Sequence, residues 1–500
     1  MLLEILTIKL TYMKFNYFLL LAFLVVLTTA CSEDEEQLAP VAEFTFSPES
    51  LLAGDEVQFT DNSQPGSNDI IEWTWDFGVV EANSDQQNAT YVYQEEGDYD
   101  VRLFIKDASG MTAICEKVIT VEDKPVTEFE ATLDWTFNNG TAVEGYNDAT
   151  RAAIADDGTI YYVEGMGANS QVVAVTDNGT SATKKWAYAA GVNIKNAPSV
   201  DTDGNVYIGS WAVPSLLSLS AGDGSVRWQG ETGNRGVSNS SCAMDDNGNV
   251  YVSTKGSASA GLYSFSPDGT KRWEVLDLGS TYSTPALSAD GSTAYFFDTS
   301  NGLVYAINAS DGSFKWNEAV STSAGYGTSI SVDSDGTLYL TTDTEVVAVS
   351  DNSSSGAVKW TSAISLANSS GVVIGTDGTL YTGSSAGVYA LNPADGSVKW
   401  QNEVVIEESV PAVDKNDNIY VGTQDGRLVI INSLGEKVKE FTLGNGIVNS
   451  PVMADDGTIY VESYDASAGT ITLNKISVPD SAPADSAWPM KGKNRRHTSM

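Results

Sequence analysis

The sequence predicts an all-β protein whose larger part is an eight-bladed β-propeller, and three observations support this fold class. A short acidic–glycine turn followed by a tyrosine recurs over the last two-thirds of the chain, and successive motif tyrosines lie 46, 44, 44, 44, 42, 39 and 40 residues apart. A second motif, in which a glycine precedes a tryptophan by four residues, recurs out of phase with the first. Helical periodicity is nearly absent after residue 30. A near-constant period of this length is typical of a repeat architecture.

The repeat has eight copies, and each copy has the composition of a four-stranded blade. In the unit around Tyr339, apolar or β-branched residues alternate over 328–332, 337–340, 346–349 and 359–361, and Asp335-Gly336 separates the first two runs. Alternation bounded by Asp-Gly predicts hairpins. Four strands per repeat match a propeller blade, whose edges are protected by radial repetition. The motif tyrosines are Tyr161, Tyr207, Tyr251, Tyr295, Tyr339, Tyr381, Tyr420 and Tyr460.

The phase of the two motifs predicts how the ring closes. No tryptophan motif follows Tyr460, and no tyrosine motif precedes Trp135. We therefore expect the strand at 131–138 to complete the last blade. The seventh unit has Glu440-Phe441 where the tryptophan would fall. The tyrosines and tryptophans are interpreted as packing residues between blades.

The N-terminus resembles a bacterial lipoprotein signal. Residues 1–30 carry a short basic region and an apolar core, too short to span a membrane, that ends at Ala30-Cys31. The resemblance to a lipobox, with Thr28 in place of the usual aliphatic residue, implies lipidation of Cys31; an ordinary cleavage site is the alternative. The start at Met1 or Met13 stays open. Residues 31–40 form an acidic linker that resembles a surface-export tag of Gram-negative lipoproteins, although a solvated spacer has a similar composition.

Residues 41–122 lack the repeat and predict a separate β-sandwich. They contain Trp73-Thr74-Trp75-Asp76-Phe77-Gly78 and a terminal run of β-branched residues. This segment resembles the PKD domain, an immunoglobulin-like module. The resemblance implies a spacer, or alternatively a module for modest protein and glycan contacts. Residues 123–130 form a short linker.

Residues 131–480 resemble the pyrroloquinoline-quinone (PQQ) type of propeller repeat, and the tail at 481–500, with Trp488-Pro489-Met490, resembles a segment that flanks such propellers. That family includes quinoprotein dehydrogenases and non-enzymatic scaffolds, among them a lipoprotein of outer-membrane barrel assembly. The chain has no adjacent cysteines and no haem-attachment motif. We expect no enzyme activity and no cofactor; PQQ and calcium lack matching site motifs. A PQQ-dependent dehydrogenase with an atypical site is the alternative.

Charge and turn chemistry restrict the function further. The chain has 27 basic and 66 acidic residues, a net charge of −39, which argues against nucleic-acid binding. The Asp-x-Asp-Gly segments at Asp201 and Asp333 lack a full set of calcium ligands, so we interpret them as turns. His497 is the only histidine and is the fourth residue from the end of the sequence, which suits a surface or packing residue.

The irregular loops between blades are the expected ligand face, because the Asp-Gly turns on the opposite face are short and uniform. We predict a cell-surface lipoprotein of the outer membrane, held in the lipid through Cys31 and acting as a monomer. Its propeller would bind a protein or glycan ligand without catalysis. A periplasm-facing assembly scaffold is a further alternative. The candidate ligand-binding residues are Arg151, Lys195, Trp211, Arg235, Tyr282, Tyr326 and Glu408.

Overall fold

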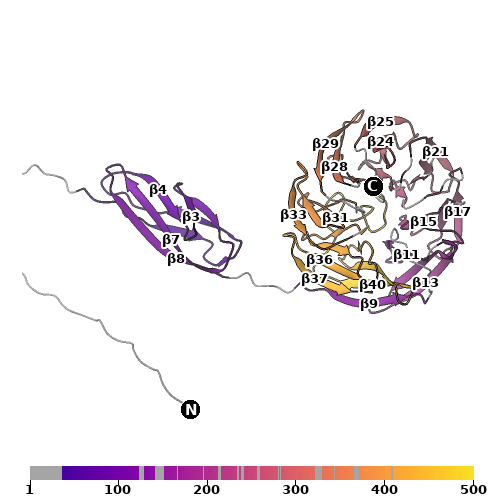
Figure 1. Cartoon of the computed structure of the whole chain (residues 1–500), viewed down its shortest axis with the longest axis horizontal. Coiled ribbons are helices and arrows are strands. Elements are labelled where there is room, and N and C mark those ends of the chain that lie inside the picture. The colour runs from indigo at the N-terminus through magenta and orange to yellow at the C-terminus, as the bar shows by residue number, and fades with distance from the viewer. Residues whose placement is uncertain are drawn as a thin grey trace, which may run out of the picture. The chain divides into compact units, whose positions relative to one another are not determined.

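The computed structural model is all-β and contains two compact units, residues 1–127 and 128–500, shown in Figure 1. The residues it describes are 37–80, 82–122, 129–140, 151–165, 167–194, 196–211, 215–233, 236–237, 241–255, 260–279, 281, 283–320, 329–342, 344–364, 371–406 and 409–500. Within these ranges the one helical element is a 3-10 turn, η1 (Gly167–Asn169). No helix there has the length and apolar character needed to cross a membrane.

The first unit is a two-sheet sandwich, as the sequence predicts. One sheet has the order β1 (Phe44–Ser47), β3 (Glu56–Asp61), β6 (Ala89–Val92), and the other has the order β2 (Leu51–Leu52), β8 (Thr112–Glu122), β7 (Gly97–Asp107), β4 (Ile70–Asp76), β5 (Asn83–Ser84). Trp75 is fully buried between the sheets, and its indole N–H donates to the carbonyl of Gln86 at 2.8 Å. Phe77 is also buried, so these two residues of the Trp-x-Trp-x-Phe motif are core residues.

The second unit consists of eight four-stranded antiparallel sheets, which confirms the predicted eight-bladed propeller. Figure 1 shows the fourth strands on the outside of the ring. Blades 1 to 4 are β10 (Ala153–Ile154), β11 (Ile160–Glu164), β12 (Gln171–Asp177), β13 (Ala182–Ala189); β14 (Ser199–Val200), β15 (Val206–Gly209), β16 (Leu216–Leu219), β17 (Val226–Gly230); β18 (Ala243–Met244), β19 (Val250–Ser253), β20 (Gly261–Phe265), β21 (Lys271–Leu276); and β22 (Ala286–Leu287), β23 (Thr293–Asp298), β24 (Leu303–Asn308), β25 (Phe314–Ala319).

Blades 5 to 8 follow the same plan, except that the last blade takes its fourth strand from the start of the unit. They are β26 (Ser331–Val332), β27 (Thr337–Thr341), β28 (Glu345–Asp351), β29 (Gly356–Ala363); β30 (Val373–Ile374), β31 (Leu380–Ser384), β32 (Gly387–Leu391), β33 (Val398–Asn402); β34 (Ala412–Val413), β35 (Ile419–Gly422), β36 (Arg427–Ile431), β37 (Lys437–Thr442); and β38 (Val452–Met453), β39 (Ile459–Asp465), β40 (Thr470–Ser477), β9 (Thr132–Asn138).

The Asp-to-Tyr spacing of the first motif is explained by a turn that both residues stabilise. One carboxylate oxygen of Asp201 accepts the backbone N–H groups of Asp203 and Asn205 at 3.0 and 2.8 Å. Its other oxygen accepts the hydroxyl of Tyr207 at 2.8 Å. Asp245 with Tyr251 and Asp414 with Tyr420 repeat this arrangement at 2.8 and 2.9 Å. The acidic residue therefore orders the hairpin and satisfies a buried phenol, which supports the turn interpretation.

The second motif joins neighbouring blades. The indole N–H of Trp360 in blade 5 donates to the carbonyl of Pro393 in blade 6 at 2.9 Å, and that of Trp400 donates to Ser433 in blade 7 at 2.8 Å. The motif glycine lies directly beneath this ring. A Cβ on Gly396 would stand 2.5 Å from Cε3 of Trp360. The tryptophan of one blade thus requires a glycine in the next, which confirms the predicted packing role.

Substitution of Gly396 by alanine will test this packing against a control with the same backbone strain. Gly396 and Gly336 both have left-handed φ, +72° and +82°, but a Cβ on Gly336 would meet nothing within 4 Å. We expect Gly336→Ala to cost about 1 kcal/mol from φ alone, and Gly396→Ala about 1–3 kcal/mol more because Trp360 must move. Denaturant unfolding of the full chain measures both values. Equal losses would contradict the packing explanation.

The ring closes as the motif phase predicts. Strand β9 pairs antiparallel with β40, with Trp135 opposite Lys475. Asp177 of blade 1 receives three donors from blade 8, namely the Trp135 indole at 3.0 Å, the Tyr460 hydroxyl at 2.7 Å and the Lys475 ammonium at 2.9 Å. Burial alone would raise the pKa of Asp177, but the hydrogen bonds from Lys475 and Tyr460 outweigh burial and hold the pKa below its usual value.

The prediction that Glu440-Phe441 takes the place of the seventh tryptophan was wrong by one residue. Lys439 pairs with Ile430, as Trp400 pairs with Ala390 in blade 6. Lys439 therefore occupies the tryptophan position. The adjoining blade is blade 8, whose last two strands come from opposite ends of the unit and share no hairpin turn. At the interface of blades 7 and 8, blade 7 therefore lacks the motif tryptophan, and blade 8 lacks the hairpin turn that would carry the motif glycine beneath it.

Candidate functional site

The propeller has two chemically different faces. We define the turn face as the end of the blades that carries the Asp-Gly turns between first and second strands, such as 201–204 and 333–336. The loop face is the opposite end, where the loops between blades and the turns between second and third strands lie. The sequence predicts that ligand binding belongs to the loop face.

The C-terminal segment, residues 481–500, runs along the turn face and into the ring, where Figure 1 places the C-terminus. Its backbone carbonyls accept hydrogen bonds of 2.7–2.9 Å from the last residue of the first strand in six blades. The donor and acceptor residues are Ile154 with Arg495, Val200 with Arg496, Met244 with Thr498, Leu287 with Ser499, Ile374 with Trp488, and Val413 with Pro489.

Side chains of the same segment fill the ring and neutralise turn-face acids. Trp488 and Met490 are 1% and 2% exposed. The guanidinium of Arg495 pairs with Asp156 at 2.8 Å and with Asp455 at 3.0 Å, which joins the turns of blades 1 and 8. The chain's own C-terminal segment therefore covers part of the turn face, and a smaller pocket of about 320 Å³ remains there between this segment and the turns at Asp201 and Asp245.

His497 belongs to this packing and is unsuited to acid–base catalysis. It is 3% exposed, and its Nδ1 lies 3.2 Å from the carbonyl oxygen of Pro198. Burial, with the nearby charges of Arg151 and Lys491, lowers the pKa of His497 to about 3. The imidazole is thus neutral at physiological pH and donates to Pro198.

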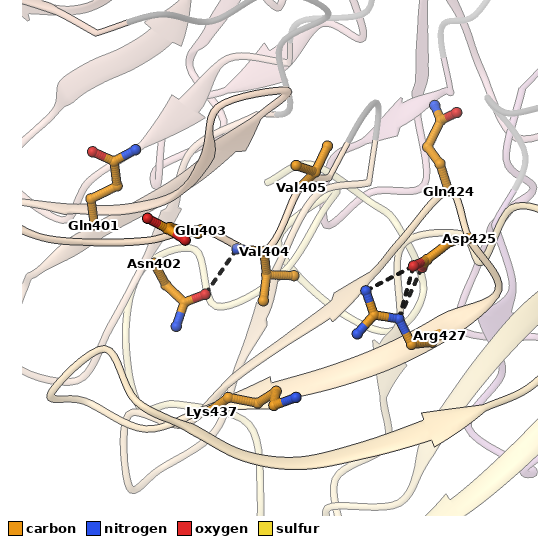
Figure 2. Close-up of a pocket in the computed structure, with 9 residues that line it drawn as sticks. All are labelled: Gln401, Asn402, Glu403, Val404, Val405, Gln424, Asp425, Arg427 and Lys437. Carbon is orange, nitrogen blue, oxygen red and sulfur yellow. Dashed lines mark hydrogen bonds and ion pairs between the residues drawn. The ribbon is translucent and has the colours of Figure 1, made fainter.

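A groove of about 680 Å³ opens between blades 6 and 7, and Figure 2 shows its lining. One wall is the end of β33 with the loop that follows it, and the other is the turn between β35 and β36. Both are loop-face elements; only Lys437, the first residue of β37, lies toward the other end of its strand. The lining residues are Gln401, Asn402, Glu403, Val404, Val405, Gln424, Asp425, Arg427 and Lys437.

Charged groups in the groove are held in place by one another. The Arg427 guanidinium donates to both oxygens of Asp425 at 2.8–3.0 Å and to Glu440 at 3.0 Å. Lys437 donates to the same oxygen of Glu440 at 2.9 Å. The hydrogen bond from Arg427 holds the pKa of Asp425 below its usual value. Figure 2 also shows the Asn402 amide oxygen accepting the Val404 N–H, at 2.9 Å.

This arrangement suits binding by hydrogen bonds more than bond-breaking chemistry. Its donors and acceptors are fixed in advance, which reduces the ordering cost of holding a polar ligand. Val404 and Val405 add apolar surface. In the described ranges, no cluster of three or more His, Cys, Asp or Glu side chains is placed to hold a metal ion.

The structure describes two of the seven residues predicted to bind ligand. Arg151 is 4% exposed, whereas Trp211 is 44% exposed in the turn between β15 and β16 on the loop face. Cys31 also falls outside the described ranges. The remaining predicted residues outside them are Lys195, Arg235, Tyr282, Tyr326 and Glu408.

Sequence reasoning missed the groove between blades 6 and 7. Asp425-Gly426-Arg427 resembles any other hairpin turn in the sequence. The available signal was an arginine directly after an Asp-Gly pair on the loop face. Its contacts with Glu440, thirteen residues further on, depend on strand pairing between β36 and β37.

These features define a PKD sandwich followed by a PQQ-like propeller of four-stranded blades. Residues 37–122 match the model of the PKD domain. Residues 168–402 and 386–477 match the model of the family described as outer membrane protein assembly factor BamB. The chain belongs to this family.

Solved propellers share the fold at low sequence identity. BamB from Moraxella catarrhalis has a TM-score of 0.52 and 18% identity, covering 69% of this chain and 97% of that one. The quinohemoprotein alcohol dehydrogenase ADHIIG from Pseudomonas putida HK5 has a TM-score of 0.52 and 12% identity, covering 71% and 77%. At these identities the likeness shows the fold alone.

Curated relatives are similar over a short stretch. Collagenase ColQ1 of Bacillus cereus (strain Q1) is 34% identical over 107 residues, which are 21% of this chain and 11% of the collagenase. Collagenase ColA of Clostridium perfringens (strain 13 / Type A) is 34% identical over 82 residues, 16% and 7% of the two chains. The chain spans about a tenth of the length of these relatives.

Proposed function

We propose that this protein is a non-catalytic, lipid-anchored scaffold of the cell envelope, which binds a protein or glycan ligand through the loop face of its propeller. One observation carries the choice of face. On the turn face, the chain's own C-terminal segment is hydrogen-bonded to the first strands of six blades and occupies the inner part of that face. The loop face carries the irregular loops and the groove between blades 6 and 7. Variable loops on a rigid framework are where binding residues concentrate.

Paired charge-reversal variants test the choice of face. Glu403 and Gln424 are exposed groove residues, and Asp203 is an exposed residue of a turn-face hairpin. Immobilised full-length protein would be used to capture envelope proteins and to probe a glycan array. We expect Glu403→Arg with Gln424→Arg to reduce capture at least about tenfold, a loss of roughly 1.4 kcal/mol, and Asp203→Arg to leave it unchanged. Loss with Asp203→Arg alone would contradict the proposal.

Anchoring and orientation are tested in cells. Membrane attachment through Cys31 predicts incorporation of a labelled fatty acid, and Cys31→Ser will abolish it. Surface display predicts that protease added to intact cells digests the protein. Membership of the family described as outer membrane protein assembly factor BamB favours a second candidate, a periplasm-facing assembly scaffold. Protection of lipidated protein from protease would support that candidate against surface display.

The non-catalytic part of the proposal has its own test. The purified protein would be loaded with PQQ and calcium and mixed with alcohols or sugars and an artificial electron acceptor. We expect no reduction of the acceptor. Reduction would overturn the proposal in favour of a quinone-dependent dehydrogenase.

A further inference from the structure

Trp211 on the loop face is a large aromatic residue that the fold holds in an exposed position. It is 44% exposed, whereas Trp75 and Trp488 are almost fully buried. The exposed part of this indole is apolar surface left in water, and the burial energy of that part is forgone. Tryptophan is among the residues most enriched where binding energy concentrates in an interface.

Backbone contacts from two neighbouring loops fix the position of Trp211. Its N–H donates to the carbonyl of Asn193, in the loop between blades 1 and 2, at 3.1 Å. In the loop between blades 2 and 3, a Cβ on Gly236 would stand 2.7 Å from the Trp211 carbonyl oxygen. Val237, which is fully buried, donates to the carbonyl of Ser210 at 2.8 Å. The glycine therefore lets this loop pack against the tryptophan backbone, so the backbone that carries the indole is already in place before a ligand binds.

A positive charge lies against the same ring. The ammonium of Lys255, from blade 3, is 4.9 Å from the centroid of the Trp211 ring. The backbone N–H of Lys255 donates to the Gly236 carbonyl at 3.0 Å, so the same loop positions both residues. A cation at this distance is attracted to the indole face. The result is a partly exposed apolar surface with a cation beside it.

We propose that Trp211 and Lys255 form a subsite for an acidic saccharide, such as a hexuronate unit of a polysaccharide. A pyranose ring has an apolar C–H face that stacks on an indole. A hexuronate adds a carboxylate, which the Lys255 ammonium complements. A neutral sugar would contact only the Trp211 indole, and a small anion would pair only with the Lys255 ammonium. This inference rests on the proposed role of the loop face and adds the ligand class.

The test compares two probes of the same sugar backbone, one with free carboxylates and one in which methyl esters remove their charge. Oligogalacturonate and its fully methyl-esterified form would be titrated into the full-length protein by calorimetry. We expect tighter binding of the acidic probe. Trp211→Ala will weaken binding of the acidic probe by about tenfold or more, and Lys255→Gln will reduce it to the level of the ester. Control variants are Phe314→Ala, an exposed aromatic on β25, and Lys415→Gln, an exposed turn-face lysine; both will bind as the wild type does.

Contact is measured separately from affinity. In protein labelled with 5-fluorotryptophan, the ¹⁹F signal that Trp211→Phe removes will shift on adding the acidic probe. Binding that is unchanged in Trp211→Ala would overturn the subsite, and equal affinity for both probes would overturn the acidic class. If neither probe binds while the groove variants still reduce capture of an envelope protein, this inference fails and the proposed function stands.

Discussion

A propeller fragment that starts at residue 139 will be far less stable than one that starts at residue 128. The two fragments differ by strand β9, which supplies the fourth strand of blade 8. Its loss removes Trp135, which is 6% exposed, and the cost of deleting a buried tryptophan side chain alone is about 3–5 kcal/mol. It also strips Asp177 of one of its three donors from blade 8 and leaves the edge of β40 unpaired.

Thermal unfolding followed by far-ultraviolet circular dichroism compares the two fragments. We expect a lower midpoint and weaker cooperativity for the fragment that lacks β9. A synthetic peptide of residues 129–140 will raise its midpoint in a concentration-dependent way, because the peptide binds only the folded ring. A scrambled peptide is the control. Identical midpoints would mean that the pairing of β9 with β40 does not contribute to the stability of the propeller.

The sequence was sufficient to predict the blades because their chemistry is local. The carboxylate of Asp201 and the hydroxyl of Tyr207 meet within one hairpin, so their spacing repeats wherever that hairpin does. The closing strand could also be predicted, since the surplus Trp135 at one end matches the deficit after Tyr460 at the other. The seventh tryptophan position was misassigned by one residue, although the motif spacing of four residues from Gly435 gives Lys439, the residue that pairs with Ile430.

The packing of the C-terminal segment, the groove and the surroundings of Trp211 depend on contacts that no short sequence motif encodes. The C-terminal segment forms no strand with an alternating pattern, and three of its non-glycine residues have left-handed φ, namely Lys493 (71°), His497 (55°) and Ser499 (51°). Such conformations persist where the surroundings determine them. The groove beside Arg427 and the cation over Trp211 likewise join residues of neighbouring strands or blades. Periodicity predicts the framework, whereas these sites lie where the repeats differ.

Trp488→Ala will produce the second large loss of stability, and it separates the two roles that tryptophan has in this chain. Trp488 is 1% exposed in a core cluster with Val332 and Ile374, and its carbonyl accepts the Ile374 N–H at 2.8 Å. Truncation to alanine should cost about 3–5 kcal/mol, because the rigid first strands cannot collapse into the space. Trp211→Ala is the comparison variant and should cost clearly less than Trp488→Ala, because the Trp211 side chain is already 44% exposed.

Denaturant unfolding and limited proteolysis of the full chain measure this contrast. Loss of Trp488 should loosen the C-terminal segment, so that protease removes residues near the C-terminus before it cuts the blades. The same variant should keep its loop-face ligand under conditions where it is folded, because the segment lies on the turn face. A stable Trp488→Ala variant with an intact C-terminus would show that the C-terminal segment contacts the propeller without stabilising it. If Trp488→Ala lost the ligand while fully folded, the turn face would take part in binding, and the assignment of binding to the loop face would be wrong.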